Sequence, residues 1–544
     1  MPRQPISFTV GSYPWIEATD TGVTSTALYR SYLVLPYELT SEVTCEETKD
    51  PLPFVSHWVD SKGNRWSKYE LPRGESPDSQ SLVRFGSPDG VQNTISVPLG
   101  TGIARSSLDE VLDEALDEDV SPVGSFEFYV GLRSFIDQHI QFMNDLNDFQ
   151  RPNRLYWEGN CVGLQIRSVH RAVLRWSKSE SKDNAKLALI VKLARDIAKP
   201  LGQICESPRV VLRRTREMQN IGRIQEIDPA CLRWIARQPG RDIYERAGTR
   251  QELLGVVRKE DSDTLENRVV KDLLHRARIE CSNYTSIYRE YADYERVRTV
   301  SSFRRRIIDL EKHSEIRSAK SLVGHVQPNY VLLHEPKYRK LWDAYQALLS
   351  QQKQKDDIWK WRDRTFSESC QCMVMSLIHS LAHRSMLHKS DLLLKHEAIT
   401  GQFISKRTEY GPLNYQGVGK QRMLLLSTGA STNQRAFVPR GFLPLGIDFL
   451  IVAPHRTAPT ALFPFWCFSE IDDQTLESGL MLLENKLAAI PRSDHIYPTI
   501  FVFERPDLEK RFFHGRGHIV SVALPVQTTL ERYRDCFLNL LQSI

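Results

Sequence analysis

The sequence predicts an α+β protein of several domains, and three observations support this fold class. A chain of 544 residues is long enough for two to four domains with large cores. Residues 1–100 alternate short β-type runs with turns, whereas from Phe126 onward apolar residues recur at helical spacing. Residues 445–503 read as strand, strand, helix and strand. We expect a β-rich domain over 1–105, an acidic linker or helix over 106–124, a helical and basic module over 125–350, and an α/β domain over 351–544.

The N-terminal β-rich domain is expected to be a small sandwich or barrel that serves binding or assembly. Residues 60–63 (DSKG) and 87–90 (SPDG) have the composition of hairpin turns. The acidic run that follows, residues 108–120, contains seven acids. It is predicted to be a solvated linker, with a short helix as the alternative.

Composition excludes several protein classes. Hydrophobic residues make up 41% of the chain and charged residues 26%, which is typical of soluble proteins. We expect a cytoplasmic protein without membrane contact, because no apolar run approaches about 20 residues and the start lacks a signal pattern. The nine cysteines are scattered and are expected to be reduced thiols. No GxxxxGK[ST] motif occurs, so an ATP-driven step would require a partner.

Charge is distributed unevenly along the chain. The net charge is +5, but residues 1–150 hold 10 basic and 23 acidic residues, which leaves +18 for residues 151–544. This asymmetry predicts that the middle of the protein contacts a polyanion, with a solvated basic surface as the alternative. Arginine suits phosphate oxygens, and without a base-reading pattern we expect backbone contacts to DNA. The candidate DNA-binding residues are Arg167, Arg171, Arg175, Arg209, Arg213, Arg214, Arg216, Arg304, Arg305 and Arg306.

Asp448 and Glu470 are acids in otherwise apolar strands. Asp448 precedes the run FLIV, and Glu470 follows the run FWCF closely. A carboxylate in a core strand loses hydration, so it needs a partner, a metal ion or a place at the sheet edge. Two such acids on neighbouring strands could hold a divalent cation through oxygen ligands. Alternatively, both acids end their strands on the solvent side.

The order of elements, with a helix near residues 366–388 before the strands, resembles the PD-(D/E)xK nuclease fold. The resemblance implies that Asp448 and Glu470 bind Mg²⁺, and that a lysine two residues after the second acid helps to activate water. Here Asp472 stands at that position. Lys486 in the following helix is the candidate replacement for the lysine. The domain is therefore expected to be a degenerate nuclease without a cofactor, or an active one with Mg²⁺.

Two motifs in the middle of the chain resemble signatures of the McrC-like family of prokaryotic restriction and antiphage proteins. They are DTLENRVVK at residues 263–271 and PKYRKLWDAY at residues 336–345. Glu266, Arg268, Tyr338 and Arg339 are expected to form a structural cluster between helices. A long helical pair lies between the motifs, and the first helix is expected to begin at Ser262 or Asp263 in a capping box with Glu266.

The McrC-like resemblance implies a DNA-associated subunit of an antiphage defence system that acts beside an ATPase or helicase subunit in a homo- or hetero-oligomeric assembly. The favoured form has a non-catalytic nuclease-like domain. The alternatives are an active Mg²⁺-dependent endonuclease that uses Lys486 and a scaffold subunit that binds only proteins.

Overall fold

The computed structural model forms two compact units. The first contains Met1–Val111, Val120–Asn184 and Lys353–Ile544, and the second contains Leu112–Asp119 and Ala185–Gln352. The structure describes residues 9–11, 13–15, 30–39, 43–46, 51–60, 62–75, 79–86, 91–100, 102–108, 125–148, 161–177, 188–322, 324, 326–381, 391–397, 401–404, 409–417, 419–427, 440–453, 460–471, 473–491, 495–524 and 526–542. The turn expected at 87–90, the acidic segment 109–124 and Asp472 lie outside the described residues.

The N-terminal part of the first unit consists of two antiparallel sheets around one core, as the β-type runs predict. The first sheet has the order β1-β2-β5-β4, and the second has the order β3-β6-β7. The strands are β1 Thr9–Gly11, β2 Tyr32–Pro36, β3 Thr44–Cys45, β4 Phe54–Val59, β5 Arg65–Glu70, β6 Gln80–Gly86 and β7 Gln92–Pro98. The turn predicted at 60–63 joins β4 to β5, and Gly63 adopts the positive φ of +86° that glycine allows. Leu33, Phe85 and Val97 lie in the shared core.

A seven-stranded sheet forms the C-terminal part of the first unit, with the order β13-β14-β15-β16-β17-β19-β18. Its strands are β13 Glu409–Gly417, β14 Gly419–Ser427, β15 Phe449–Ala453, β16 Ala461–Phe468, β17 Thr499–Phe503, β18 Arg511–Phe512 and β19 Gly517–Val522. β13 to β16 pair antiparallel, whereas β16 pairs parallel with β17 and β17 with β19. A crossover helix, α13 (Asp473–Ala488), connects β16 to β17, as parallel pairing requires.

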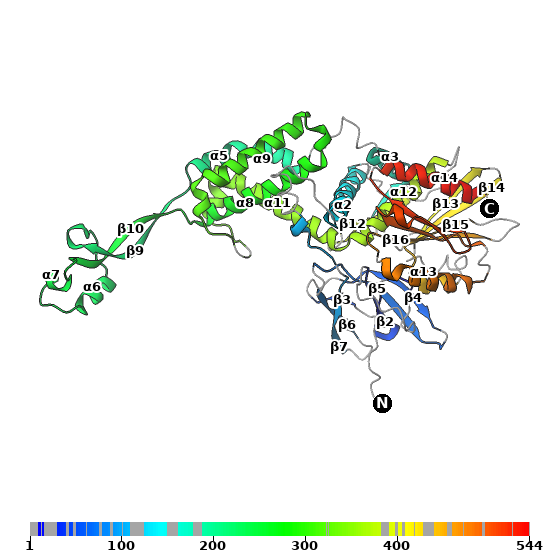
Figure 1. The fold of residues 1–544 in the computed structure, drawn as a ribbon, viewed down its shortest axis with the longest axis horizontal. Coiled ribbons are helices and arrows are strands. Elements are labelled where there is room, and N and C mark those ends of the chain that lie inside the picture. The colour runs from blue at the N-terminus through cyan, green and yellow to red at the C-terminus, as the bar shows by residue number, and fades with distance from the viewer. Residues whose placement is uncertain are drawn as a thin grey trace. The chain divides into compact units, whose positions relative to one another are not determined.

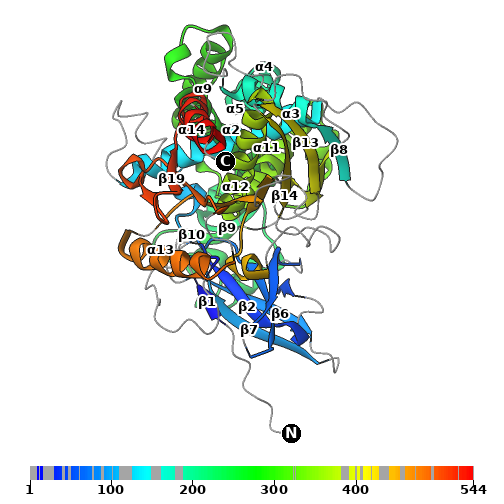
Figure 2. The same cartoon turned by 90° about the vertical axis from the view of Figure 1, so that its right-hand side faces the viewer.

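Helices cover both faces of this sheet, which explains why its strands are continuous apolar runs. Successive residues alternate between the faces: Phe449 and Ile451 lie in one core, whereas Leu450 and Val452 lie in the other. The first core also contains residues of α2 (Ser125–Asp148), α3 (Ile166–Ser177), α12 (Arg362–Leu381) and α14 (Val526–Gln542), and the second contains residues of α13. The placement of α13 opposite α12 and α14 is visible in Figure 1 and, from the side, in Figure 2.

Helices α2 and α3 belong to the first unit, which differs from the expected single module over residues 125–350. Phe135 and Trp176 from these helices pack with Phe366 of α12 and Phe503 of β17 in one core. A three-stranded sheet with the order β12-β11-β8 is also part of this unit; its strands are β8 Cys161–Gln165, β11 Asp391–Glu397 and β12 Gly401–Ile404.

The second unit is a helical bundle with its own core. Its helices are α4 Leu189–Asp196, α5 Ala198–Glu206, α8 Leu265–Ile287, α9 Glu295–His313, α10 Tyr330–His334 and most of α11 Pro336–Lys360, with short 3-10 turns at Arg289–Tyr291 and Glu315–Ser318. Helices α8 and α9 are the predicted helical pair. Thr264, rather than Ser262 or Asp263, is the N-cap of α8, because its side chain accepts a hydrogen bond from Asn267 N. Pro200 lies in the first turn of α5, where a missing N–H is tolerated.

A two-stranded ribbon extends from this bundle (Figure 1). Strands β9 (Val211–Asn220) and β10 (Glu252–Asp261) pair antiparallel over ten residue pairs. Helices α6 (Pro229–Ala236) and α7 (Ile243–Arg246) lie between them in the chain, at the far end of the ribbon (Figure 1). Ile235, Ala247 and Leu253 form a small core there. We call residues 211–261 the arm.

Candidate functional site

The two candidate metal-binding acids are both buried at the ends of core strands. Asp448 directly precedes β15 and is 5% exposed, while Glu470 follows β16 and is 3% exposed. The Asp448 backbone N donates to Phe465 O, and its Oδ2 accepts from Cys467 N at 2.9 Å. These bonds fix the Asp448 carboxylate against β16. The alternative in which both acids face solvent is therefore wrong.

The Asp448 carboxylate is bonded to the guanidinium of Arg30, from the N-terminal β-rich part. Arg30 Nη2 donates to Oδ1 at 2.8 Å and Nη1 donates to Oδ2 at 2.9 Å, a bidentate pair. Arg30 Nη1 also donates to Cys467 O at 2.8 Å, and Nε donates to Glu70 Oε1 at 3.1 Å. Burial opposes the charge of Arg30, but the neighbouring acids outweigh it and hold the Arg30 pKa well above its ordinary value. Arg30 is therefore a permanent cation at this acid.

A second arginine is bonded to Glu470. Arg362, the first residue of α12, is fully buried, and its Nε donates to Glu470 Oε1 at 2.6 Å. Tyr129 OH donates to the other oxygen at 3.3 Å. The guanidinium lies over the Trp359 ring, 4.8 Å from its centroid. A Cβ at Gly102 would lie 2.4 Å from Gly74 O and 2.7 Å from Arg362 Nη2, so this position requires glycine.

A third pair joins these two into one cluster. Arg73 Nε donates to Asp363 Oδ2 at 2.6 Å, and Ser469 Oγ donates to Asp363 Oδ1 at 2.6 Å. Burial by itself would raise the pKa of Asp363, but Arg73 lowers it to about 2. The buried Lys68 Nζ, also from the N-terminal β-rich part, donates a hydrogen bond to Pro14 O. In this cluster the buried arginines Arg30, Arg73 and Arg362 lie beside the buried acids Glu70, Asp363, Asp448 and Glu470.

The residues present do not fit the Mg²⁺ ion that the nuclease resemblance implies. A Mg²⁺ site needs carboxylate oxygens that are free to coordinate, yet both acids here accept hydrogen bonds from buried arginines. Lys486 Nζ donates to Trp15 O at 2.8 Å. Within the described part of the chain, no group of three or more His, Cys, Asp or Glu residues is arranged to hold a metal ion.

Sequence reasoning missed the partners of these acids, although weak signals were present. Arg30 interrupts the apolar run ALYRSYLVLP, and Arg362 and Asp363 lie between tryptophans and Phe366. A charge in such a run requires a buried partner. Which residue is the partner is not visible locally, because Arg30 and Asp448 are 418 residues apart.

The candidate DNA-binding arginines lie in three places. Arg167, Arg171 and Arg175 are on the exposed face of α3, as the helical spacing predicts. The four candidate arginines of the arm and its base are each paired with an acid. These pairs are Arg209–Glu266 at 2.5 Å, Arg213–Asp261 at 2.6 Å, Arg214–Glu226, and Arg216–Asp228 at 2.6 Å. The positive charges of these four candidate arginines are therefore partly compensated.

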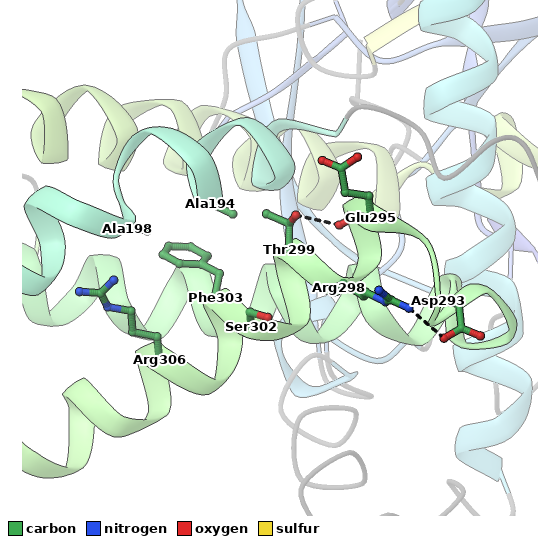
Figure 3. A pocket seen from close by; sticks show the side chains of 9 residues that line it. All are labelled: Ala194, Ala198, Asp293, Glu295, Arg298, Thr299, Ser302, Phe303 and Arg306. Carbon is green, nitrogen blue, oxygen red and sulfur yellow. Dashed lines mark hydrogen bonds and ion pairs between the residues drawn. The ribbon is translucent and has the colours of Figure 1, made fainter.

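Arg304, Arg305 and Arg306 lie on α9. Arg304 Nε donates to Ser282 Oγ of α8 at 2.8 Å, which gives it a packing role, while Arg305 is exposed. Arg306 lines an open pocket of about 540 Å³ between α9 and the α4–α5 region. In Figure 3, Arg306 lies at one end of this pocket, and Arg298 with Asp293 lies at the other. Mixed charges line the pocket, so it does not define a ligand class.

The family-like motifs come together in a hydrogen-bonded cluster, with different partners from those expected. Glu266 Oε1 accepts from Arg209 at 2.5 Å and from Asn329 Nδ2 at 2.9 Å. Tyr338 OH accepts from Arg209 N and donates to Asn267 Oδ1. Arg268 instead binds Asp263 through two bonds of 2.7 and 2.6 Å, and the Arg339 side chain is exposed. The cluster ties the base of the arm to α8 and α11.

Comparisons with known proteins give limited matches. Residues 162–345 match a family described as a domain of unknown function, DUF2357. A solved structure, described as a refined half-complex from a tetradecameric assembly of Thermococcus gammatolerans McrB AAA+ hexamers with bound McrC, is similar with 8% identity and a TM-score of 0.20. That match covers 89% of this chain and 86% of that chain. No curated protein matches. Every helix in the described segments is too short or too polar to cross a bilayer.

Proposed function

We propose that this protein is a DNA-associated subunit of an antiphage, restriction-like assembly, that it acts beside an ATPase or helicase subunit, and that its C-terminal domain is a nuclease-like fold without catalytic activity. The observation that carries the proposal is that Asp448 and Glu470 form buried ion pairs with Arg30 and Arg362. Both carboxylates are held by guanidinium groups inside the core, where a nuclease would need them to bind a metal ion.

Two further observations support the proposal, one for the nuclease-like fold and one for the assembly with an ATPase or helicase subunit. Helix α12, the antiparallel strands β14 to β16, crossover helix α13 and parallel strand β17 follow in the order typical of PD-(D/E)xK domains. The motifs at residues 263–271 and 336–345, which resemble McrC-like signatures, share one hydrogen-bond cluster. They support an assembly in which nucleotide hydrolysis is supplied by another subunit.

Electrostatics disfavour catalysis at this site. A hydrolytic nuclease stabilises a deprotonated water with metal ions and a nearby cation. Here each acid accepts hydrogen bonds from a buried arginine, and Lys486 binds a backbone carbonyl. Releasing either acid would leave an uncompensated charge in the core, at a cost of about 3–5 kcal/mol.

A nuclease assay tests the absence of catalysis. Wild-type protein and Lys486→Met, each alone and with any ATPase or helicase subunit found to be encoded beside it, are incubated with plasmid DNA and Mg²⁺ or Mn²⁺. We expect no cleavage above that of the ATPase alone. Cleavage by the wild type that Lys486→Met abolishes would establish the alternative, an active endonuclease with a relocated lysine.

DNA association is tested on α3 and the arm separately. Arg167, Arg171 and Arg175 are exposed on one helix, so their joint change to Glu should weaken DNA binding for every sequence and reduce its salt dependence. The matched change of Arg213, Arg214 and Arg216, each of which has an acidic partner, tests the arm in the same way. Wild-type protein without salt-sensitive DNA binding, alone or with the ATPase, would favour the scaffold alternative instead.

A further inference from the structure

Basic residues occur along the whole arm, but only those of the ribbon strands are paired with acids. The five basic residues of β9 and β10 form the ion pairs Arg213–Asp261, Arg214–Glu226, Arg216–Asp228, Arg258–Glu226 and Lys259–Glu217. We call residues 221–251, which lie between these strands, the tip. Its six basic residues are all arginines: Arg223, Arg233, Arg237, Arg241, Arg246 and Arg250. Within the described part of the chain, none of these six is ion-paired with an acid.

The four acids of the tip already have other partners. Glu226 and Asp228 form ion pairs with ribbon arginines, and Asp228 also caps α6. Asp242 caps α7 by accepting a hydrogen bond from Glu245 N at 2.8 Å, and Glu245 Oε2 accepts one from Arg241 N at 2.7 Å. Two acids outside ion pairs therefore stand against six arginines, which leaves the tip with a charge of +4.

Three of these arginines meet at the turn that joins α6 to α7. Arg237 is the C-cap of α6, and Arg241 lies just before α7. Arg246 Nε donates to Gly240 O at 3.1 Å, which brings its guanidinium to the same turn. The side chains of Arg237 and Arg241 are exposed and bond to no described residue. Neighbouring cations without acids create a local positive potential that attracts a polyanion.

The kind of cation and its position both suit a phosphate backbone. The planar guanidinium fork of arginine matches phosphate oxygens better than the ammonium of lysine does, and the tip contains no lysine. Ten residue pairs make the ribbon about 30 Å long, so the tip projects from the bundle (Figure 1). A projecting tip can reach a backbone that the bundle itself does not contact.

We propose that the tip is a DNA-binding surface whose arginines contact the phosphate backbone of a duplex without reading its sequence. The inference rests on the proposed DNA association and places it on residues outside the candidate arginines of α3, α9 and the ribbon. Contacts to phosphates fix the position of a protein on DNA and carry no base information. The arm is then the element that brings this contact to the bundle.

The test measures the fluorescence anisotropy of a short labelled DNA duplex titrated with full-length protein at several salt concentrations. The tip variant carries Arg237→Glu, Arg241→Glu and Arg250→Glu, at exposed side chains that bond to no described residue. It should bind at least tenfold more weakly than wild type for every duplex sequence. Its plot of log K against log salt concentration should be less steep by about 3, because each lost phosphate contact removes about one released counterion.

A matched control separates the tip from the overall charge of the protein. It carries Arg65→Glu, Arg511→Glu and Arg534→Glu, three exposed arginines of the first unit, so its net charge changes equally. The control should bind the duplex within about threefold of wild type, because distant surface charges are screened by salt. Circular dichroism should show wild-type helical content in both variants. If the tip variant does not fold, Arg237→Gln with Arg241→Gln replaces it and should still weaken binding at least threefold.

A folded tip variant that binds the duplex as tightly as wild type would overturn the inference, and so would an equal loss in the control. If the tip variant keeps DNA binding but loses association with an ATPase or helicase subunit found to be encoded beside it, the tip is a protein contact instead. The exposed Leu232, Ile243 and Tyr244 would then supply its apolar part. Wild-type protein without salt-sensitive DNA binding would refute the proposed DNA association and this inference with it, which distinguishes that failure from a failure of the tip alone.

Discussion

Loss of the buried Arg30–Asp448 ion pair should cost much more stability than loss of an exposed ion pair. Both side chains are about 2% exposed, so neither can be solvated when its partner is removed. Arg30→Met should lower the free energy of unfolding by about 3–5 kcal/mol, because it leaves the Asp448 carboxylate buried without its partner. The double change Arg30→Met with Asp448→Leu should recover part of this lost free energy. Urea unfolding measures both values.

The control for this double-mutant cycle is the exposed pair Arg532–Glu509, which are 61% and 36% exposed. Its removal should change the free energy of unfolding by no more than about 1 kcal/mol. Similar costs for the two pairs would show that burial does not set the strength of the Arg30 contact.

His139 should make stability depend on pH well above the range where carboxylates titrate. It is buried in α2, next to Ser369 Oγ at 2.7 Å, and burial lowers its pKa to about 3. The unfolded value is about 6.5, so below that pH the unfolded state binds one more proton and stability falls as pH decreases towards 3. Denaturant unfolding between pH 7.5 and 5 should show this slope.

The slope should be smaller by about one proton in His139→Gln, where no imidazole is left to protonate. An unchanged slope in His139→Gln would assign the pH dependence to other groups.

Among the elements, the arm should be dispensable for folding. Its small core at Ile235, Ala247 and Leu253 is separate from the bundle core, and most residues of β9 are exposed. Replacing residues 213–259 by Asn-Gly between the paired residues Leu212 and Glu260 should leave the helical content and melting temperature of the bundle nearly unchanged. Circular dichroism checks this, and loss of the bundle transition would show that the arm is structural.

Helices and strands are predictable from the sequence where their burial requires a regular pattern of apolar residues. Strands β15 to β17 are buried on both faces and appear as apolar runs, and α8 and α9 each show an apolar stripe. Strand β9 shows no such pattern, because a two-stranded ribbon without a buried face imposes no alternation on Val211–Asn220.

The acids of the candidate site were predictable, but their partners were not. Asp448 and Glu470 are anomalous within their own strands, so a local pattern finds them. Arg30 and Arg362 are recognisable as partners only once β2, α12 and the sheet are assembled. The long sequence separations, 418 and 108 residues, are the reason that no local pattern reveals the pairing.

At the scale of the whole molecule, the two units should unfold separately. Each has its own hydrophobic core. Leu273→Ala and Leu483→Ala both remove a fully buried side chain, one from each unit, and each should cost about 2–5 kcal/mol. Scanning calorimetry of the full chain should show two transitions, with each variant lowering only one. A single transition lowered equally by both would show that the units unfold together.

The pairing of Arg30 with Asp448 also has a consequence for how the protein is made. A ribosome adds about 5–20 residues per second, so Arg30 is synthesised roughly 20 to 80 s before Asp448, which follows it by 418 residues. During that interval the nascent β-rich part has Arg30, Lys68 and Arg73 without the acids of the C-terminal sheet, while the whole second unit emerges between them. The first unit can therefore reach its native form only near the end of translation, and its early strands depend on protection from aggregation until then.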